Sequence, residues 1–148
     1  MGRELVGYVQ TLNKNKWEVL PLKARNYMNE YEYTDIWRCG DEVYDVLKEY
    51  GTYLPEEDEK ALEEEIFTDP EERSDYDSEC IGDKRPWHKI GLGGLKYLAI
   101  GMEIEDEEDY KVKRQIDELV KEIETMLRLT NFDYKSFEDV RFVFYLSF

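Results

Sequence analysis

The chain has 148 residues and a formal net charge of −16, with 36 acidic side chains against 20 basic ones. That length is enough for one domain with a hydrophobic core, and the high aromatic content argues against disorder of the whole chain. The negative charge disfavours direct binding to nucleic acid or to acidic membranes. The sequence has no apolar run long enough to cross a bilayer, and its first residues do not resemble the apolar core of a signal peptide, so we expect a soluble cytoplasmic protein.

The N-terminal part predicts a β-hairpin. Its strands are Leu5–Val9 and Trp17–Leu20, joined by a polar turn at Asn13–Lys16 that is not of the two-residue Asn-Gly type. Tyr33–Arg38 is a further candidate strand.

Two helices are expected next. The first covers about Asp41–Tyr50, because apolar side chains recur there at helical spacing and Gly51 is a natural stop. The second begins at Pro55 with four acidic residues, which complement the positive N-terminal end of a helix. It has few apolar residues and should lie on the surface, followed by a loop over residues 69–86.

The last third of the chain supplies most of the predicted core. Trp87–Met102 is mainly apolar, Val112–Leu127 has the clearest amphipathic pattern, and Val140–Leu146 is apolar on both faces, as in an interior strand. We predict one α+β domain over residues 1–148, with an acidic helix and loop at 55–86. Its antiparallel or mixed sheet combines the N-terminal hairpin with the C-terminal strand, and three to four helices pack on it. Within the segment Trp87–Met102, the core candidates are Leu92, Leu95, Leu98 and Ile100.

Several short stretches resemble a group of small acidic proteins encoded by phages and prophages. They are the hairpin ending in Trp17–Leu20, the segment Arg38–Leu47, the stretch Trp87–Leu95 and the C-terminal Glu138–Phe144. The chain ends in Leu-Ser-Phe, where related sequences more often end in Asp-Asn. The resemblance implies a phage accessory protein acting in a bacterial host cell, and it carries over no functional residues.

Motifs for catalysis and metal binding are incomplete. Asp75–Glu79 begins like a calcium loop, but Cys80 and Pro86 stand where that loop needs Gly and a bidentate Glu. With one histidine, His88, and two distant cysteines, Cys39 and Cys80, the chain has no zinc-site spacing. The glycine-rich stretch 91–94 is neither a phosphate loop nor a dinucleotide motif. We therefore predict no catalytic residue, no metal and no cofactor, with His88 as a packed structural residue and both cysteines as free thiols.

Two acidic blocks carry the charge. Glu56–Glu79 nets −11 and Glu103–Asp109 nets −6, so the remainder of the chain nets +1. Duplex DNA carries one charge per about 1.7 Å, and a helix rises about 1.5 Å per residue, so an acidic helix approaches the charge density of DNA. A basic nucleic-acid channel would be attracted to such a surface.

This density predicts a non-enzymatic protein that mimics DNA and inhibits a host nucleic-acid-handling defence protein of the anti-CRISPR or anti-restriction type. Tyrosines beside the blocks would anchor the complex, because exposed charges mainly steer. The predicted partner-binding residues are Glu56, Glu57, Asp58, Glu59, Glu63, Glu64, Glu65, Asp69, Glu71, Glu72, Asp75, Asp77, Glu79, Glu103, Glu105, Asp106, Glu107, Glu108, Asp109, Tyr53, Tyr76 and Tyr110.

Two alternatives stay open. The chain could be a structural or assembly module, such as a homodimer formed through the apolar face of Val112–Leu127 or an edge strand, with acidic residues that only aid solubility. It could also be an enzyme that uses paired carboxylates, although pairs arise by chance among so many acidic residues.

Overall fold

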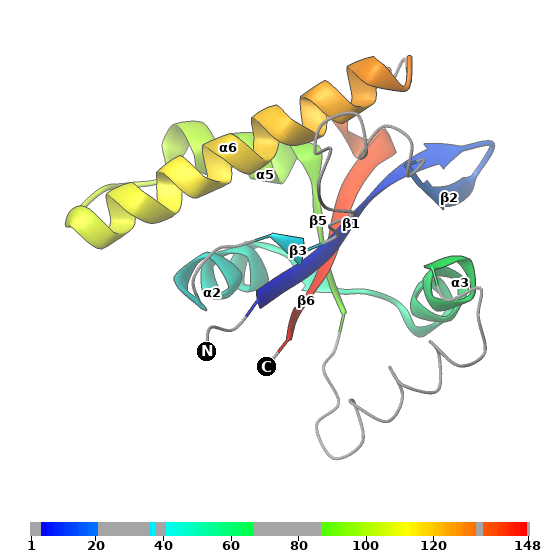
Figure 1. Ribbon diagram of the computed structural model, residues 1–148, viewed down its shortest axis with the longest axis horizontal. Coiled ribbons are helices and arrows are strands. Elements are labelled where there is room, and N and C mark those ends of the chain that lie inside the picture. Colours follow the sequence, from blue (N-terminus) through cyan, green and yellow to red (C-terminus); the bar gives the residue numbers. More distant parts are fainter. Residues whose placement is uncertain (1–3, 21–35, 38–40, 67–86, 133–134, 148) are drawn as a thin grey trace.

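The computed structural model describes residues 4–20, 36–37, 41–66, 87–132 and 135–147, and these form an antiparallel sheet with helices on both faces (Figure 1). The predicted α+β class is confirmed. The strands are β1 (Glu4–Asn13), β2 (Lys16–Val19), β3 (Ile36–Trp37), β4 (Thr52–Tyr53), β5 (His88–Gly91) and β6 (Val140–Ser147); the helices are α2 (Asp41–Tyr50), α3 (Glu56–Ile66), α5 (Leu92–Gly101), α6 (Glu107–Leu129) and the 3-10 helix η1 (Phe137–Asp139).

Strand β6 lies at the centre of the sheet. The order is β2-β1-β6-β5-β4, and β3 pairs with the other end of β1. Side chains of β6 alternate between the faces, so that Phe142 and Phe144 enter one core cluster while Val143 and Tyr145 enter another. All four are buried, which confirms the interior strand predicted from its two apolar faces.

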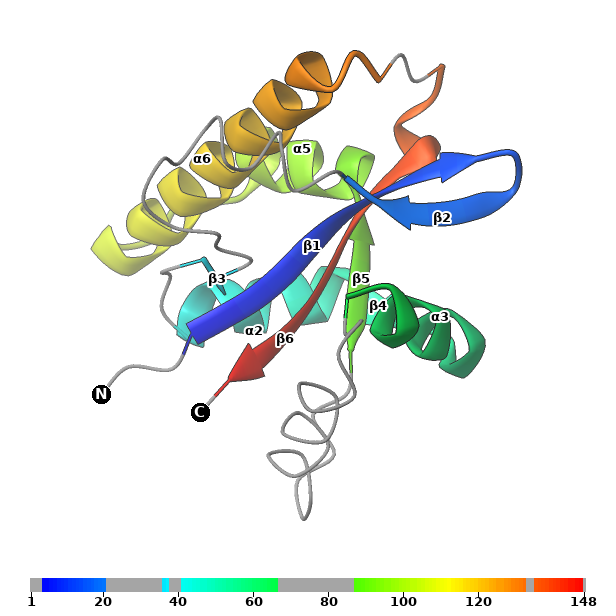
Figure 2. The same ribbon diagram turned by 45° about the vertical axis from the view of Figure 1, so that its right-hand side comes forward.

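The two faces of the sheet are covered by different helices. Helices α2, α5 and α6 pack on the face of Phe142 and Phe144, and α6 contributes its whole predicted stripe from Val112 to Leu127. Helix α3 covers the opposite face, where Leu62 packs in the cluster of Trp87 and Val143. Figures 1 and 2 show this separation, with α5 and α6 on one side of the sheet and α3 on the other.

The hairpin turn is tighter than the sequence predicted. Only Lys14 and Asn15 lie between β1 and β2, and both have positive φ, of 52° and 65°. This is the conformation of a type I′ turn, whose backbone twist matches that of the two strands. Asn tolerates positive φ, so a two-residue loop forms here without glycine.

The apolar stretch from Trp87 to Met102 divides into a strand and a helix at Gly91. Strand β5 pairs with both β6 and the short strand β4, and the sequence predicted neither pairing. Three predicted core residues of α5 are buried, but Ile100 is 81% exposed and that prediction was wrong. The helical spacing of Val43, Val46, Leu47 and Tyr50 predicts one apolar stripe on α2, but Tyr50, in the last turn, is exposed and its part of that prediction was wrong.

Gly7 allows the closest side-chain packing in the sheet. A Cβ atom at this position would overlap the ring of Phe142, which lies across the glycine in the core. We expect Gly7→Ala to lower the free energy of unfolding by about 1–3 kcal/mol, because the ring is fully buried and has little room to move. Urea denaturation of the variant measures this loss.

The matched control is Gly93→Ala, whose methyl group would meet Phe137 at an ordinary contact distance of 3.5 Å. The double variant Gly7→Ala/Phe142→Leu should lose less stability than the sum of the two single variants, because the smaller Leu side chain makes room for the methyl group. Equal stability of Gly7→Ala and the parent protein would contradict the packing described.

Candidate binding surfaces

The acidic block at Glu103–Asp109 begins helix α6. The carboxylate of Asp106 caps the helix by accepting a hydrogen bond from the Asp109 N–H at 2.8 Å, and Asp109 Oδ2 accepts from the Glu105 N–H at 3.0 Å. Acidic side chains in the first turn also interact favourably with the helix dipole. Part of this block therefore stabilises the start of α6, while the carboxylates of Glu103 and Glu105 are exposed outside the helix.

Exposed apolar side chains stand beside these acids. Ile100 is 81%, Tyr110 57% and Ile104 48% exposed, and the ring of Tyr97 lies alongside Gly101. Helices α5 and α6 are joined here by a hydrogen bond of 3.1 Å, which Lys113 Nζ in the second turn of α6 donates to the Ile100 carbonyl oxygen of α5. We call this region, comprising Tyr97, Ile100 and Glu103–Tyr110, the α5–α6 surface.

Helix α3 presents fewer available acids than its sequence suggests. Glu65 accepts a hydrogen bond from the Val19 N–H at 2.6 Å, which fastens the helix to β2. Glu59 and Glu63 are also engaged with other groups. The exposed acids of the helix that remain are Glu56, Glu57 and Glu64, which we call the α3 surface.

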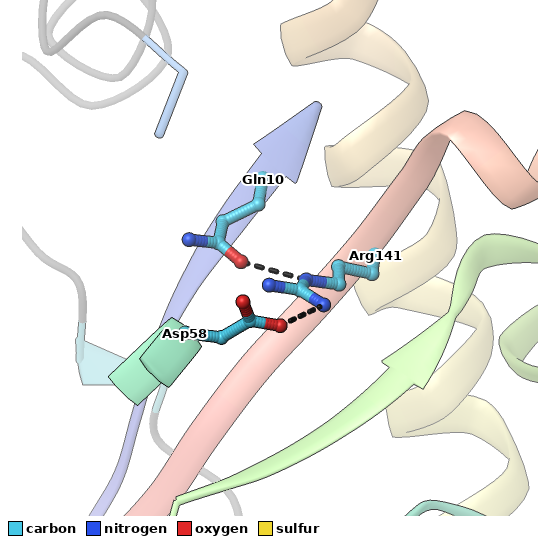
Figure 3. Close-up of polar contacts among 3 residues, drawn as sticks. All are labelled: Gln10, Asp58 and Arg141. Atoms are coloured by element: carbon cyan, nitrogen blue, oxygen red, sulfur yellow. Dashed lines mark hydrogen bonds and ion pairs between the residues drawn. The ribbon is translucent and has the colours of Figure 1, made fainter. Parts of the chain in front are cut away.

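Asp58 points inward and pairs with a buried arginine (Figure 3). Arg141 Nη1 lies 3.3 Å from Asp58 Oδ2, its Nε donates to Gln10 Oε1 at 2.7 Å, and its guanidinium lies 4.1 Å from the centre of the Trp17 ring. The arginine side chain is 5% exposed. Burial lowers the pKa of Arg141 and Asp58 raises it, and an arginine remains protonated under these conditions.

This cluster was not predicted. Arg141 was read as part of an apolar strand, yet its position in β6 places it on the α3 face, directly opposite Gln10 of β1. One charged residue inside a strand that is apolar on both faces was the available signal, because such a charge requires partners.

The two acidic surfaces do not form one patch. The α3 surface lies over one face of the sheet and the α5–α6 surface lies at the far end of the helices on the other face, as Figures 1 and 2 show. The predicted residues Asp69, Glu71, Glu72, Asp75, Tyr76, Asp77 and Glu79 fall outside the described residues. The described acids therefore give two separate surfaces.

His88 and the predicted anchor Tyr53 pack against each other. His88 is buried, with its ring 4.6 Å from that of Tyr53 and 5.8 Å from that of Phe144, as expected for a packed residue. Tyr53 is exposed on its other side. Cys39 and Cys80 lie outside the described residues. Across the parts of the chain that the structure describes, no group of three His, Cys, Asp or Glu residues could hold a metal ion.

The apolar face of α6 is used inside the chain. Its stripe from Val112 to Leu127 is buried against the sheet and α5, so it is not available as the dimer interface considered from the sequence. Among the described helices, none has the length and apolar character needed to cross a membrane.

Comparisons with protein-family models, curated proteins and solved structures give no match to this chain. The resemblance to phage and prophage proteins thus stays a prediction.

Removing the charge of Asp58 tests its role beneath α3. Asp58→Asn leaves the buried guanidinium of Arg141 without its counter-charge, so we expect the free energy of unfolding to fall by about 1–3 kcal/mol. The lower half of that range is favoured because Asp58 is 35% exposed. Glu57→Gln, an exposed neighbour on the same helix, is the control and should change stability little. A loss no larger than the control's would refute the structural role of Asp58.

The pH dependence of stability should include a contribution from Glu65. Burial raises the pKa of this carboxyl above its ordinary value of 4.5, the Val19 hydrogen bond lowers it, and Glu18 raises it. The folded state therefore holds the proton more tightly than the unfolded state. The resulting stabilisation is complete below the unfolded pKa and is lost as pH rises through the folded pKa.

Glu65→Gln keeps an oxygen that can accept from Val19 but carries no charge. We expect it to be more stable than the parent at neutral pH, with the difference vanishing below pH 4.5. The urea denaturation midpoints of variant and parent, measured from below pH 4.5 to neutral pH, give this difference in stability, and Glu64→Gln is the control. A less stable Glu65→Gln at neutral pH would mean that the charged hydrogen bond outweighs the burial of the carboxylate.

Proposed function

We propose that this protein is a non-enzymatic inhibitor that binds a basic surface of a host nucleic-acid-handling protein, such as a CRISPR effector or restriction enzyme. The observation that carries the proposal is the α5–α6 surface, where Ile100 and Tyr110 stand exposed among acidic side chains. Large exposed apolar groups rimmed by charge are typical of protein-binding sites. A basic partner provides the complementary charge.

The two kinds of side chain have different roles in this proposal. Glu103 and Glu105 raise the rate of encounter with a positive surface, because exposed charges act mainly on association and are screened by salt. Ile100 and Tyr110 supply affinity, since buried aromatic and aliphatic anchors carry most of the binding energy in interfaces. Tyr110 was predicted as an anchor, and its exposure fits that role.

The arrangement of the acids favours local docking over extended mimicry of DNA. Two surfaces on opposite sides of the sheet cannot lie along one strip, and Asp58 and Glu65 of α3 are bonded to Arg141 and Val19. The α5–α6 surface therefore stands as the main contact in the proposal, and the α3 surface is its natural comparison.

A pair of matched charge reversals tests the proposal. Glu103→Lys/Glu105→Lys alters the α5–α6 surface, and Glu57→Lys/Glu64→Lys makes the same charge change on the α3 surface. Purified protein would be used to capture partners from bacterial lysate at low and high salt, followed by affinity measurements with the identified partner. We expect the first variant to weaken binding about tenfold or more and the second to have a much smaller effect.

The partner must have two properties. It must be a nucleic-acid-handling protein whose activity is inhibited, and its binding must weaken as salt is raised. Ile100→Ser should weaken binding at all salt concentrations, because it removes an apolar contact. Equal loss in both charge variants, or a partner bound without salt dependence, would contradict the proposal and favour the assembly module.

A further inference from the structure

A pocket lies where β5 turns into α5, and its lining includes residues from the α3 face of the sheet together with the end of α2 and the start of α5. It has a volume of about 340 Å³ and is lined by Trp17, Tyr50, Lys89, Gly91, Glu138 and Arg141 among others. This volume lies within the range of small-molecule sites. Lys89 and Gly91 share a face with Arg141, because Gly91 pairs directly with Arg141 across the strands.

Positive groups gather at this pocket in an otherwise acidic protein. Arg141 is almost completely buried, and its Nη2 has no hydrogen-bond partner among the described groups, although Nε and Nη1 are bonded. A buried cationic nitrogen without a partner is costly, and such groups in native structures call for an explanation. Lys89 adds a second cation on the pocket wall, and the structure places no described carboxylate within ion-pair distance of it.

The backbone adds a third contribution. Helix α5 begins beside the pocket, its N-cap Gly91 provides no side-chain hydrogen bond, and its first turn has no acidic residue. The first N–H groups of a helix that lack caps attract anions, through hydrogen bonds and the helix dipole. Gly94 also lines the pocket, so the backbone is accessible there.

We propose that this pocket binds a small phosphate monoester through Lys89, Arg141 and the uncapped amides of α5. Trp17 and Tyr50 offer apolar walls to the organic part of such a ligand. Glu138 can accept hydrogen bonds from its hydroxyl or amino groups. The Trp17 ring covers the guanidinium, so a phosphate that reaches Nη2 displaces the indole.

This site is separate from the α5–α6 surface and does not depend on it. The pocket lies at the start of α5, beside Gly91 and Gly94, whereas the α5–α6 surface lies at the other end of that helix, beside Ile100. Failure of either proposal leaves the other standing.

The test is titration of the full chain with inorganic phosphate and with AMP, against sodium chloride of equal ionic strength. Amide NMR shifts of Gly91, Gly93 and Gly94 report the position of binding, and tryptophan fluorescence reports movement of Trp17. We expect both probes to shift these amides with millimolar or tighter affinity. Tighter binding of AMP would assign the apolar walls to its organic part, and equal binding would limit recognition to the phosphate.

Two variants locate the site. Lys89→Gln removes one cation, and Gly91→Ala adds a methyl group to the pocket wall at an ordinary contact distance of 4.0 Å from the Val140 carbonyl oxygen, with the backbone unstrained. Each should weaken phosphate binding about tenfold or more. Lys111→Gln, exposed on α6, and Gly101→Ala, at the far end of α5 where the methyl group meets Tyr97 at an ordinary 3.7 Å, are the matched controls and should retain it.

Thermal melting confirms that each variant is folded before its affinity is compared. If neither phosphate nor AMP shifts these amides at about 10 mM, the proposal is overturned, because any remaining affinity would be weaker than millimolar. Shifts that are unchanged in both Lys89→Gln and Gly91→Ala would also overturn it, because they would place the ligand elsewhere.

Discussion

Burial of β6 on both faces is the constraint on which the rest of the structure depends. A central strand with Phe142 and Phe144 on one side and Val143 and Tyr145 on the other must be covered twice. Helices α5 and α6 cover the first side and α3 covers the second. The described residues of the first acidic block lie in α3, those of the second lead into and begin α6, and these two helices belong to different layers. Their separation therefore follows from the way the core is built.

The core could be predicted from the sequence because periodicity decides it. The stripe of α6 and the alternation in β6 are long and regular, so the burial of Ile116 and Phe142 followed directly. Short elements had no such pattern. Strand β5 has four residues and forms along the edge of β6, and the two-residue β4 forms in turn along β5. Ile100 has the right spacing for the core, but it lies in the last turn of α5, where the chain leaves the sheet.

The polar sites were harder to predict than the core, because each depends on residues far apart in the chain. Arg141 meets Gln10 across 131 residues and Asp58 across 83. No local pattern specifies these pairings. Acidity of α3 was evident from composition, but the diversion of Asp58 and Glu65 to internal partners requires the positions of β6 and β2. Net charge is a property of sequence, whereas the charge available to a partner is a property of the fold.

The negative charge of the protein does not oppose an anion pocket at the end of β5. At physiological ionic strength charges are screened over about 8 Å, so distant carboxylates contribute little to a small ligand at that position. Its affinity is governed by the groups that line the pocket, namely the attractive Lys89, Arg141 and amides of α5, set against the carboxylate of Glu138. A large basic partner is different, because it contacts many exposed acids at once and sums their attraction. The two proposed sites, one for a basic protein at the α5–α6 surface and one for a phosphate at the start of α5, are therefore electrostatically compatible within one chain.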